Sequence, residues 1–65
     1  MKNKIKQFRE KLGISQAALS KKLDVSQSTV AMWETGENVP KTNTLPELAK
    51  ALNCSIDDLF EDKED

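Results

Sequence analysis

The sequence contains no histidine and a single cysteine, Cys54. One cysteine excludes an internal disulfide, and the missing histidines remove the usual ligand spacings of a zinc site, so we expect no metal and no cofactor. The chain also has no paired-carboxylate pocket and no phosphate-binding glycine loop, and an enzyme is therefore not expected. Cys54 is interpreted as a small buried apolar residue.

Long hydrophobic runs are missing as well. No stretch approaches the roughly 20 apolar residues of a membrane span, and no apolar segment of signal-peptide type follows the basic N-terminus, which favours a cytoplasmic location. No run of valine, isoleucine or threonine alternates at period two, and strands are therefore disfavoured. With 65 residues, of which 37% are hydrophobic, the chain is expected to form one small all-α domain over residues 1–65.

Charge is distributed unevenly, although the formal net charge is only −1. Residues 1–25 carry seven basic and two acidic side chains, a balance of +5, whereas residues 57–65 carry one basic and six acidic side chains, a balance of −5. Lysine and arginine are absent between Lys22 and Lys41. The basic end could meet phosphate groups, or both ends could be ordinary solvated faces. The acidic residues 61–65 are expected to be frayed.

The first helix is predicted over residues 2–12. Ile5, Phe8 and Leu12 lie at helical spacing and should share its buried face. Gly13 follows directly and is well placed for the left-handed conformation that ends many helices.

A second short helix should follow at once. Ser15 is its predicted N-cap, and Leu19 and Leu23 form its apolar face. It is expected to end near Asp24, because aspartate tolerates turn geometry. Ser20 is the small residue that would let this helix cross closely over the next one.

The third helix is predicted over residues 27–35, between the N-cap Ser26 and the terminating Gly36. Val30 and Trp33 should form its inner face. We expect the tryptophan to pack in the core rather than to stack on a base. The opposite, outward side carries Gln27, Ser28, Ala31 and Met32.

Two more helices are expected after a loop over residues 37–43. Thr44 and Glu47 match a capping box at the start of the fourth helix, which should stop at Asn53. Ser55 opens the fifth helix, with aspartates favourably placed in its first turn. The residues expected to be buried are Leu45, Leu48, Ala49 and Leu52 from the fourth helix and Ile56, Leu59 and Phe60 from the fifth.

Residues 16–35 are the most informative segment, because two short helices joined by a tight turn are a helix-turn-helix. With its flanks, the segment resembles the Cro/C1-type (XRE) helix-turn-helix family over residues 4–60. Ser20 and Asp24 stand where that family commonly has alanine and glycine, and both remain compatible with the turn. The residues that carry the resemblance are Ile14-Ser15-Gln16, Leu19, Leu23, Val25-Ser26, Val30, Trp33-Glu34-Thr35-Gly36, Pro40, Leu45, Leu48-Ala49-Lys50-Ala51-Leu52 and Ser55-Ile56-Asp57-Asp58-Leu59-Phe60.

The resemblance implies a compact, lambda-repressor-like five-helix domain of bacterial or phage origin. It implies sequence-specific binding of double-stranded DNA by a transcriptional regulator, most simply a repressor that binds a pseudo-palindromic operator as a homodimer. The dimer surface is expected on the fourth and fifth helices and the loop between them.

The same resemblance implies roles for individual residues. The third helix would enter the major groove, where Gln27 could pair with adenine. Arg9 and Glu34 would form a structural ion pair. The implied base contacts are Gln27, Ser28, Ala31 and Met32, and the implied phosphate contacts are Gln16, Thr29, Asn38 and Lys41. Because the third helix carries no lysine or arginine, weak binding to non-specific DNA is expected.

Three alternatives stay open at this point. The outward residues of the third helix could be plain solvent-facing positions, and Met32 could fill a gap. The chain could be the antitoxin of a toxin–antitoxin pair, for which only residues 61–65 are available as a toxin-binding segment. It could also be a protein-interaction module that has lost DNA binding, although neutral Gln27 and Ser28 argue against that.

Overall fold

The computed structural model describes residues 3–60, which fold into helices without any strand in that range. The all-α, five-helix prediction is therefore confirmed. The predictions for residues 61–65 lie outside the described residues. The helices are α1 (Ile5–Lys11), α2 (Gln16–Leu23), α3 (Gln27–Thr35), α4 (Leu45–Ala51) and α5 (Ile56–Phe60).

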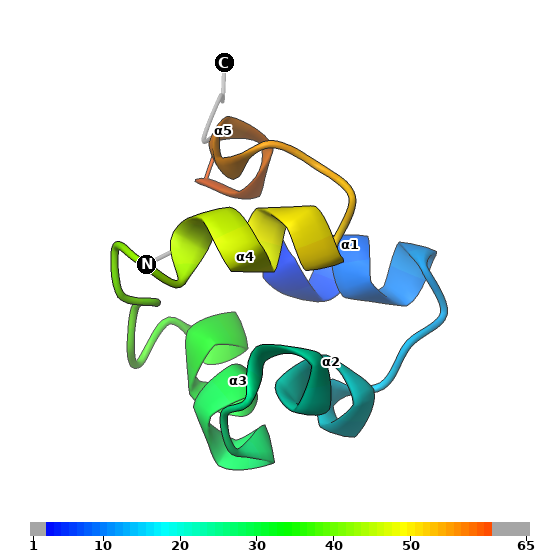
Figure 1. The fold of residues 1–65 in the computed structure, drawn as a ribbon, viewed down its shortest axis with the longest axis vertical. Helices are drawn as coiled ribbons and strands as arrows, with labels where there is room; N and C mark the ends of the chain where they lie inside the picture. Colours follow the sequence, from blue (N-terminus) through cyan, green and yellow to red (C-terminus); the bar gives the residue numbers. More distant parts are fainter. Residues whose placement is uncertain (1–2, 61–65) are drawn as a thin grey trace.

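The helices pack as two groups around one interior (Figure 1). Helix α2 packs against α3 and against α4, while α1 contacts α3 and α5 contacts α4. In Figure 1, α2 and α3 form the lower half of the molecule and α4 and α5 the upper half. Within residues 3–60, none of the helices combines the length and the apolar character that crossing a membrane needs.

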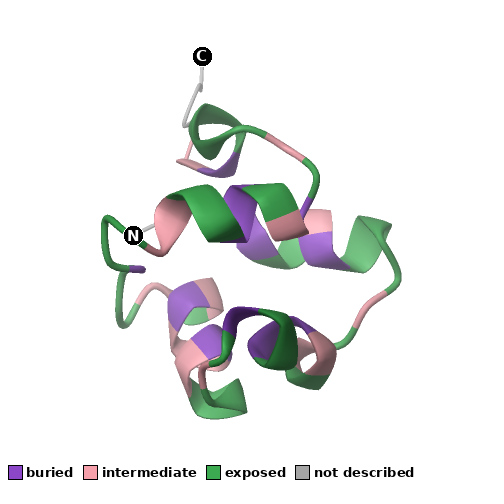
Figure 2. Cartoon of the chain, viewed as in Figure 1, coloured by how far each residue is buried: buried purple, intermediate pink, exposed green. Residues whose placement is uncertain are grey.

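The hydrophobic core draws side chains from every helix, and the buried residues face the interior between the two groups (Figure 2). The predicted inner faces of α2 and α3 are confirmed, since Leu19 and Val30 are fully buried and Trp33 is 4% exposed. Fixing both helices to one core holds α2 and α3 in a single relative orientation. The buried hydrophobic residues are Ile5, Leu19, Leu23, Val30, Trp33, Leu48, Ala49, Leu52 and Leu59.

The turn between α2 and α3 has the geometry that its sequence predicts. Asp24 adopts the left-handed conformation, with φ 59° and ψ 44°. Ser26 then caps α3, because its hydroxyl accepts a hydrogen bond from the Thr29 backbone N–H at 3.1 Å. At the crossing, Ser20 is 7% exposed and is buried with the core residues of α2. The end of α2 and the start of α3 therefore lie where the sequence predicts.

Helix α1 begins at Ile5, later than the predicted start. The reason is Asn3, whose Oδ1 accepts a hydrogen bond from the Ile5 backbone N–H at 3.1 Å. The Asn3 Nδ2 donates to the Trp33 carbonyl at 2.8 Å, which ties this residue to α3. The Lys4 backbone N–H donates to the Leu59 carbonyl at 2.8 Å. Residues 3 and 4 thus fasten α1 to α3 and α5 instead of extending the helix.

Of the residues predicted to be buried, Phe8, Leu45 and Phe60 are only partly buried, and two others are exposed. Leu12 is 44% exposed and Ile56 is 37% exposed. Leu12 lies past the last residue of α1, and Ile56 is the first residue of α5. Both are at element ends, where helical spacing alone does not show how far the packed interior extends. The buried face of α1 is completed by Arg9, which is 8% exposed.

The capping box predicted at the start of α4 is absent. Thr44 has helical dihedral angles and makes no side-chain cap, and its backbone N–H donates to the Lys41 carbonyl at 2.8 Å. The reciprocal arrangement occurs at α5 instead. There the Ser55 hydroxyl accepts from the Asp58 N–H, and the Asp58 carboxylate accepts from the Ser55 N–H, both at 3.1 Å.

Cys54 follows the left-handed Asn53 at the end of α4, where φ is 59° at the asparagine. The prediction that this cysteine is buried is only partly met, since the side chain is half-buried against the core. Burial raises the pKa of the Cys54 thiol, and nearby Asp58 adds to the effect. The thiol is thereby kept in its less reactive, protonated form.

The left-handed positions allow a direct test of the turn geometry. Gly13 has φ +73°, and a Cβ added there would meet nothing within 4 Å. We expect Gly13→Ala to lower the free energy of unfolding by about 1 kcal/mol, from backbone strain alone. Asp24→Gly, which relieves the same strain, should be neutral or stabilising. Urea denaturation followed by circular dichroism measures both, and an unchanged midpoint for Gly13→Ala would contradict the assignment.

Candidate nucleic-acid interface

Helix α3 presents two different faces along its length. Val30 and Trp33 point into the core. On the other side, Gln27 and Ser28 at the N-terminus are exposed, whereas Ala31 and Met32 are half-buried. The residues predicted to contact bases therefore share one outward face, and the first two are the most accessible. No basic residue lies on this helix, so the face offers amide and hydroxyl groups rather than charge.

Met32 is contacted by Asn38, which lies in the loop after α3. The Asn38 Nδ2 donates to the Met32 sulfur at 3.5 Å, and the Asn38 backbone N–H donates to the Met32 carbonyl at 3.2 Å. The methionine thus contacts the loop that follows α3. This position partly fits the gap-filling interpretation, and it leaves Gln27 and Ser28 as the most exposed side chains on that face.

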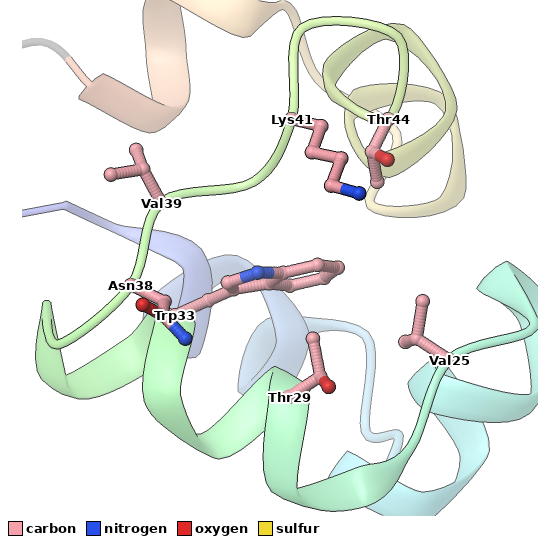
Figure 3. A pocket seen from close by; sticks show the side chains of 7 residues that line it. All are labelled: Val25, Thr29, Trp33, Asn38, Val39, Lys41 and Thr44. Carbon is pink, nitrogen blue, oxygen red and sulfur yellow. The ribbon is translucent and has the colours of Figure 1, made fainter.

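A groove of about 480 Å³ lies between α3, the turn that precedes it, the loop that follows it and the start of α4 (Figure 3). Three of the predicted phosphate contacts, Thr29, Asn38 and Lys41, line it together. Thr29 also serves the cap, since its hydroxyl lies 2.8 Å from the Ser26 hydroxyl. The remaining lining residues are Val25, Trp33, Val39 and Thr44.

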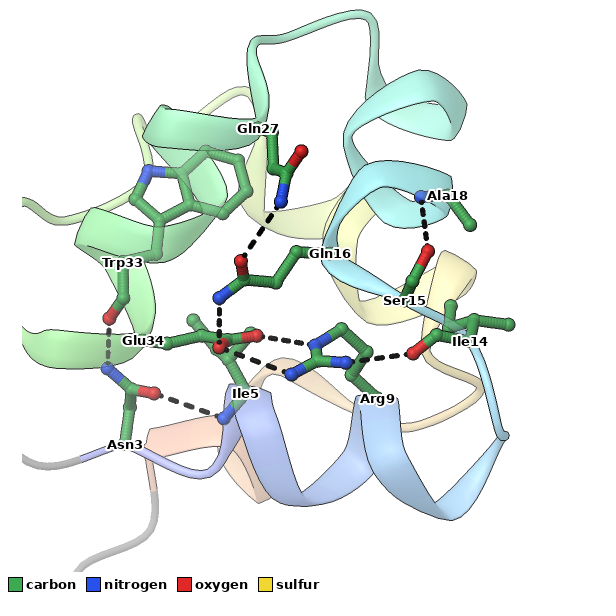
Figure 4. Close-up of polar contacts among 10 residues, drawn as sticks. All are labelled: Asn3, Ile5, Arg9, Ile14, Ser15, Gln16, Ala18, Gln27, Trp33 and Glu34. Carbon is green, nitrogen blue, oxygen red and sulfur yellow. Dashed lines mark hydrogen bonds and ion pairs between the residues drawn. The ribbon is translucent and has the colours of Figure 1, made fainter.

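The fourth predicted phosphate contact, Gln16, is not among the residues that line this groove. It is the first residue of α2 and is half-buried. Its Nε2 donates to the Glu34 carboxylate at 2.9 Å, and its Oε1 accepts from the Gln27 Nε2 at 3.4 Å (Figure 4). The structure therefore links Gln16 to a residue predicted to contact bases and to the ion pair.

Arg9 and Glu34 form that ion pair in the interior. The Arg9 Nε donates to Glu34 Oε2 at 2.6 Å, and Nη2 donates to Oε1 at 3.4 Å. The Arg9 Nη1 donates to the Ile14 carbonyl at 2.8 Å. The two side chains are 10% and 4% exposed. The hydrogen bond to Glu34 raises the pKa of Arg9 above its usual value, so the guanidinium remains charged and engaged inside the protein.

Sequence reasoning missed both the role of Asn3 and the hydrogen bonds that connect Gln16 with its two partners. A signal was available for the glutamines. Gln16 and Gln27 each follow a serine N-cap and occupy the first position of their helices. In the structure these two side chains meet, with Gln27 Nε2 donating to Gln16 Oε1 at 3.4 Å. The signal for Asn3 was weaker, because its partner is the backbone carbonyl of a residue far along the chain.

The chain is similar to known proteins over most of its length. A helix-turn-helix family model matches residues 5–59. Repressor protein C2 of Salmonella phage P22 is 43% identical over 92% of this chain, which spans only 28% of that repressor. An uncharacterized HTH-type transcriptional regulator of Bacillus subtilis, YgzD, is 37% identical over 92% of this chain and 91% of its own length. The crystal structure of the P22 c2 repressor in complex with a synthetic operator superposes with a TM-score of 0.83 and 44% identity, covering 88% of this chain and 86% of that one.

The ion pair predicts a specific pattern in a double-mutant cycle. Arg9→Met leaves the Glu34 carboxylate buried without its partner and should cost about 3 kcal/mol of unfolding free energy. Adding Glu34→Leu removes the uncompensated charge, and we expect the double variant to recover most of that loss. Urea unfolding of the single and double variants measures both steps. Equal destabilisation in the double variant would show that the pair does not act as a unit.

Proposed function

This chain belongs to the Cro/C1-type helix-turn-helix family of DNA-binding transcriptional regulators, and on that basis we propose that it is a sequence-specific repressor. The observation that carries the proposal is the exposed, uncharged N-terminus of α3, with the groove of predicted phosphate contacts beside it. A face of amides and hydroxyls next to a backbone-binding groove suits a helix that reads base edges between two phosphate strands.

We assign base recognition to the outward face of α3, placed in the major groove. The Gln27 amide can accept from N6 and donate to N7 of adenine. Ser28 can donate or accept and should discriminate less. Ala31 and Met32 offer apolar groups for the methyl of thymine. The half-buried state of the last two residues supports a smaller share of the specificity for them than for Gln27.

We assign phosphate binding to the groove and to the start of α2. Thr29, Asn38 and Lys41 line one side of α3, and of these only Lys41 carries charge. The Gln16 side chain is engaged by two neighbours, so its contribution to phosphate binding falls to the backbone N–H groups at the start of α2. A single cationic contact predicts weak non-specific binding and a shallow salt dependence.

We further propose that the repressor acts as a homodimer on a pseudo-palindromic operator. One chain contributes few base contacts, and two-fold symmetry doubles them on half-sites that lie about 34–36 Å apart. The surface assigned to the dimer is α4, α5 and the loop between them, where Ile56 is an exposed apolar side chain. The similar P22 c2 repressor has been crystallised with a synthetic operator, which supports DNA as the partner.

Selection of binding sites from a randomised pool of duplex DNA tests this proposal. We expect enrichment of a two-fold symmetric site, and Gln27→Ala should remove the preference at one position per half-site, at a cost of about 1–3 kcal/mol. Lys6→Ala, on the exposed side of α1, is the control and should select the same site. Absence of any enriched sequence at low salt would favour a protein-interaction module, and an asymmetric site would exclude the symmetric dimer.

The phosphate assignment makes a separate prediction about salt. Lys41→Ala should weaken binding to all duplex sequences about equally and reduce the slope of log K against log salt by about 1 for each chain. Fluorescence anisotropy over a range of KCl concentrations measures the slope. Lys6→Ala provides the matched loss of charge and should leave the slope unchanged. A change that depends on the base sequence would argue against a phosphate contact by Lys41.

A further inference from the structure

We propose that Asn38 fixes the Met32 side chain for contact with a thymine methyl group, and so joins a phosphate contact to the reading of a base. This inference rests on the proposed DNA binding and concerns how one base contact is made. Two hydrogen bonds connect the two residues. The Asn38 backbone N–H donates to the Met32 carbonyl at 3.2 Å, and the Asn38 Nδ2 donates to the Met32 sulfur at 3.5 Å.

The end of α3 brings Asn38 beside Met32. Gly36 adopts the left-handed conformation, with φ 87° and ψ 4°, which turns the chain away from the helix. Besides the Asn38 N–H, the Met32 carbonyl accepts from the Gly36 N–H at 3.1 Å and from the Thr35 hydroxyl at 3.2 Å. Because three donors meet at one carbonyl, residue 38 is held at a fixed place next to the methionine.

The chemistry of the two side chains sets how the Asn38 amide is turned. A thioether sulfur is only a weak acceptor, so the amide must present its N–H₂ group to Met32. That group carries two hydrogens, and one of them is left for another acceptor. Asn38 is exposed and lines the groove of predicted phosphate contacts together with Thr29 and Lys41 (Figure 3). An N–H in that groove is a suitable donor to a phosphate oxygen.

The restraint matters because methionine is a flexible side chain. Its three rotatable bonds make the entropy lost on immobilisation among the largest of any side chain. Met32 is half-buried on the outward face of α3, and a side chain already held by Asn38 loses less freedom when it meets a base. Thymine is the base that carries a methyl group in the major groove. Asn38 is thus a positioning residue that strengthens the methyl contact without touching the base.

Replacing thymine by uracil tests the inference, because this change removes the methyl group alone. Each thymine of the site selected by the unaltered chain is replaced in turn, and affinities are measured by fluorescence anisotropy. The base pair read by Met32 is the one at which the effect of uracil disappears in Met32→Ala. For the unaltered chain we expect uracil at that position to lower the affinity about fourfold, the effect of burying one methyl group.

Two variants remove the restraint in different ways. Asn38→Ala should weaken binding to every duplex and also reduce the ratio of thymine to uracil affinity below about twofold. Met32→norleucine, made by chemical synthesis of the 65-residue chain, replaces the sulfur by a methylene group. It should reduce the ratio to the same extent while the phosphate contact remains. In the doubly altered chain the ratio should fall no further, because both changes remove the same hydrogen bond.

Lys41→Ala is the matched control from the same groove. It removes a proposed phosphate contact but leaves the hydrogen bond between Asn38 and Met32 in place. We expect it to weaken binding to the thymine and uracil duplexes equally, so that the ratio of about fourfold is retained. Circular dichroism with thermal unfolding verifies the fold of every variant.

The outcomes separate this inference from the proposed function. Failure of the unaltered chain to select any sequence overturns the proposed DNA readout itself. A selected site in which no thymine methyl depends on Met32 overturns only the inference. An unchanged ratio in Asn38→Ala or in the norleucine variant overturns it as well, and so does a further fall of the ratio in the doubly altered chain, since Asn38 would then act by another route than the sulfur.

Discussion

One buried ion pair, between Arg9 on α1 and Glu34 near the end of α3, links the first helix to the third. Its geometry fixes where α3 lies relative to α1, and the Arg9 bond to the Ile14 carbonyl adds the segment that leads into α2. Three segments that come from different parts of the sequence are thereby joined at one guanidinium. Because both charges are almost fully removed from water, each requires the other. The ion pair therefore joins α1 both to α3 and to the segment that leads into α2.

The outward face of α3 and the groove of predicted phosphate contacts carry few charged groups. It contains amides, hydroxyls and a methionine, with one lysine at its flank. Such a surface gains little from the general attraction between basic proteins and phosphate, and we therefore expect its proposed DNA binding to depend on fit. Fit requires side chains that do not reorient freely. The hydrogen bonds that run from Glu34 through Gln16 restrain the Gln27 side chain, to which we assign base recognition.

Much of the fold could be predicted from local signals. The serine caps, the left-handed Asp24 and Gly36, and the spacing of Val30 and Trp33 are read within a few residues, and the structure has them where expected. Long-range contacts were harder. The role of Asn3 in shortening α1 was missed because its partner, the Trp33 carbonyl, lies thirty positions away in the sequence. The exposure of Leu12 and Ile56 depends on where the packed interior ends. The capping pattern at Thr44 failed because the preceding turn had already taken its N–H.

The most direct test of the account compares two duplexes by NMR with ¹⁵N-labelled protein, one carrying the selected site and one of unrelated sequence. The account predicts that the side-chain amide signals of Gln27 and the backbone signal of Ser28 shift only with the selected site, whereas signals at Thr29 and Lys41 shift with both. Equal shifts of all four with both duplexes would contradict it, because base reading would then not reside at the N-terminus of α3.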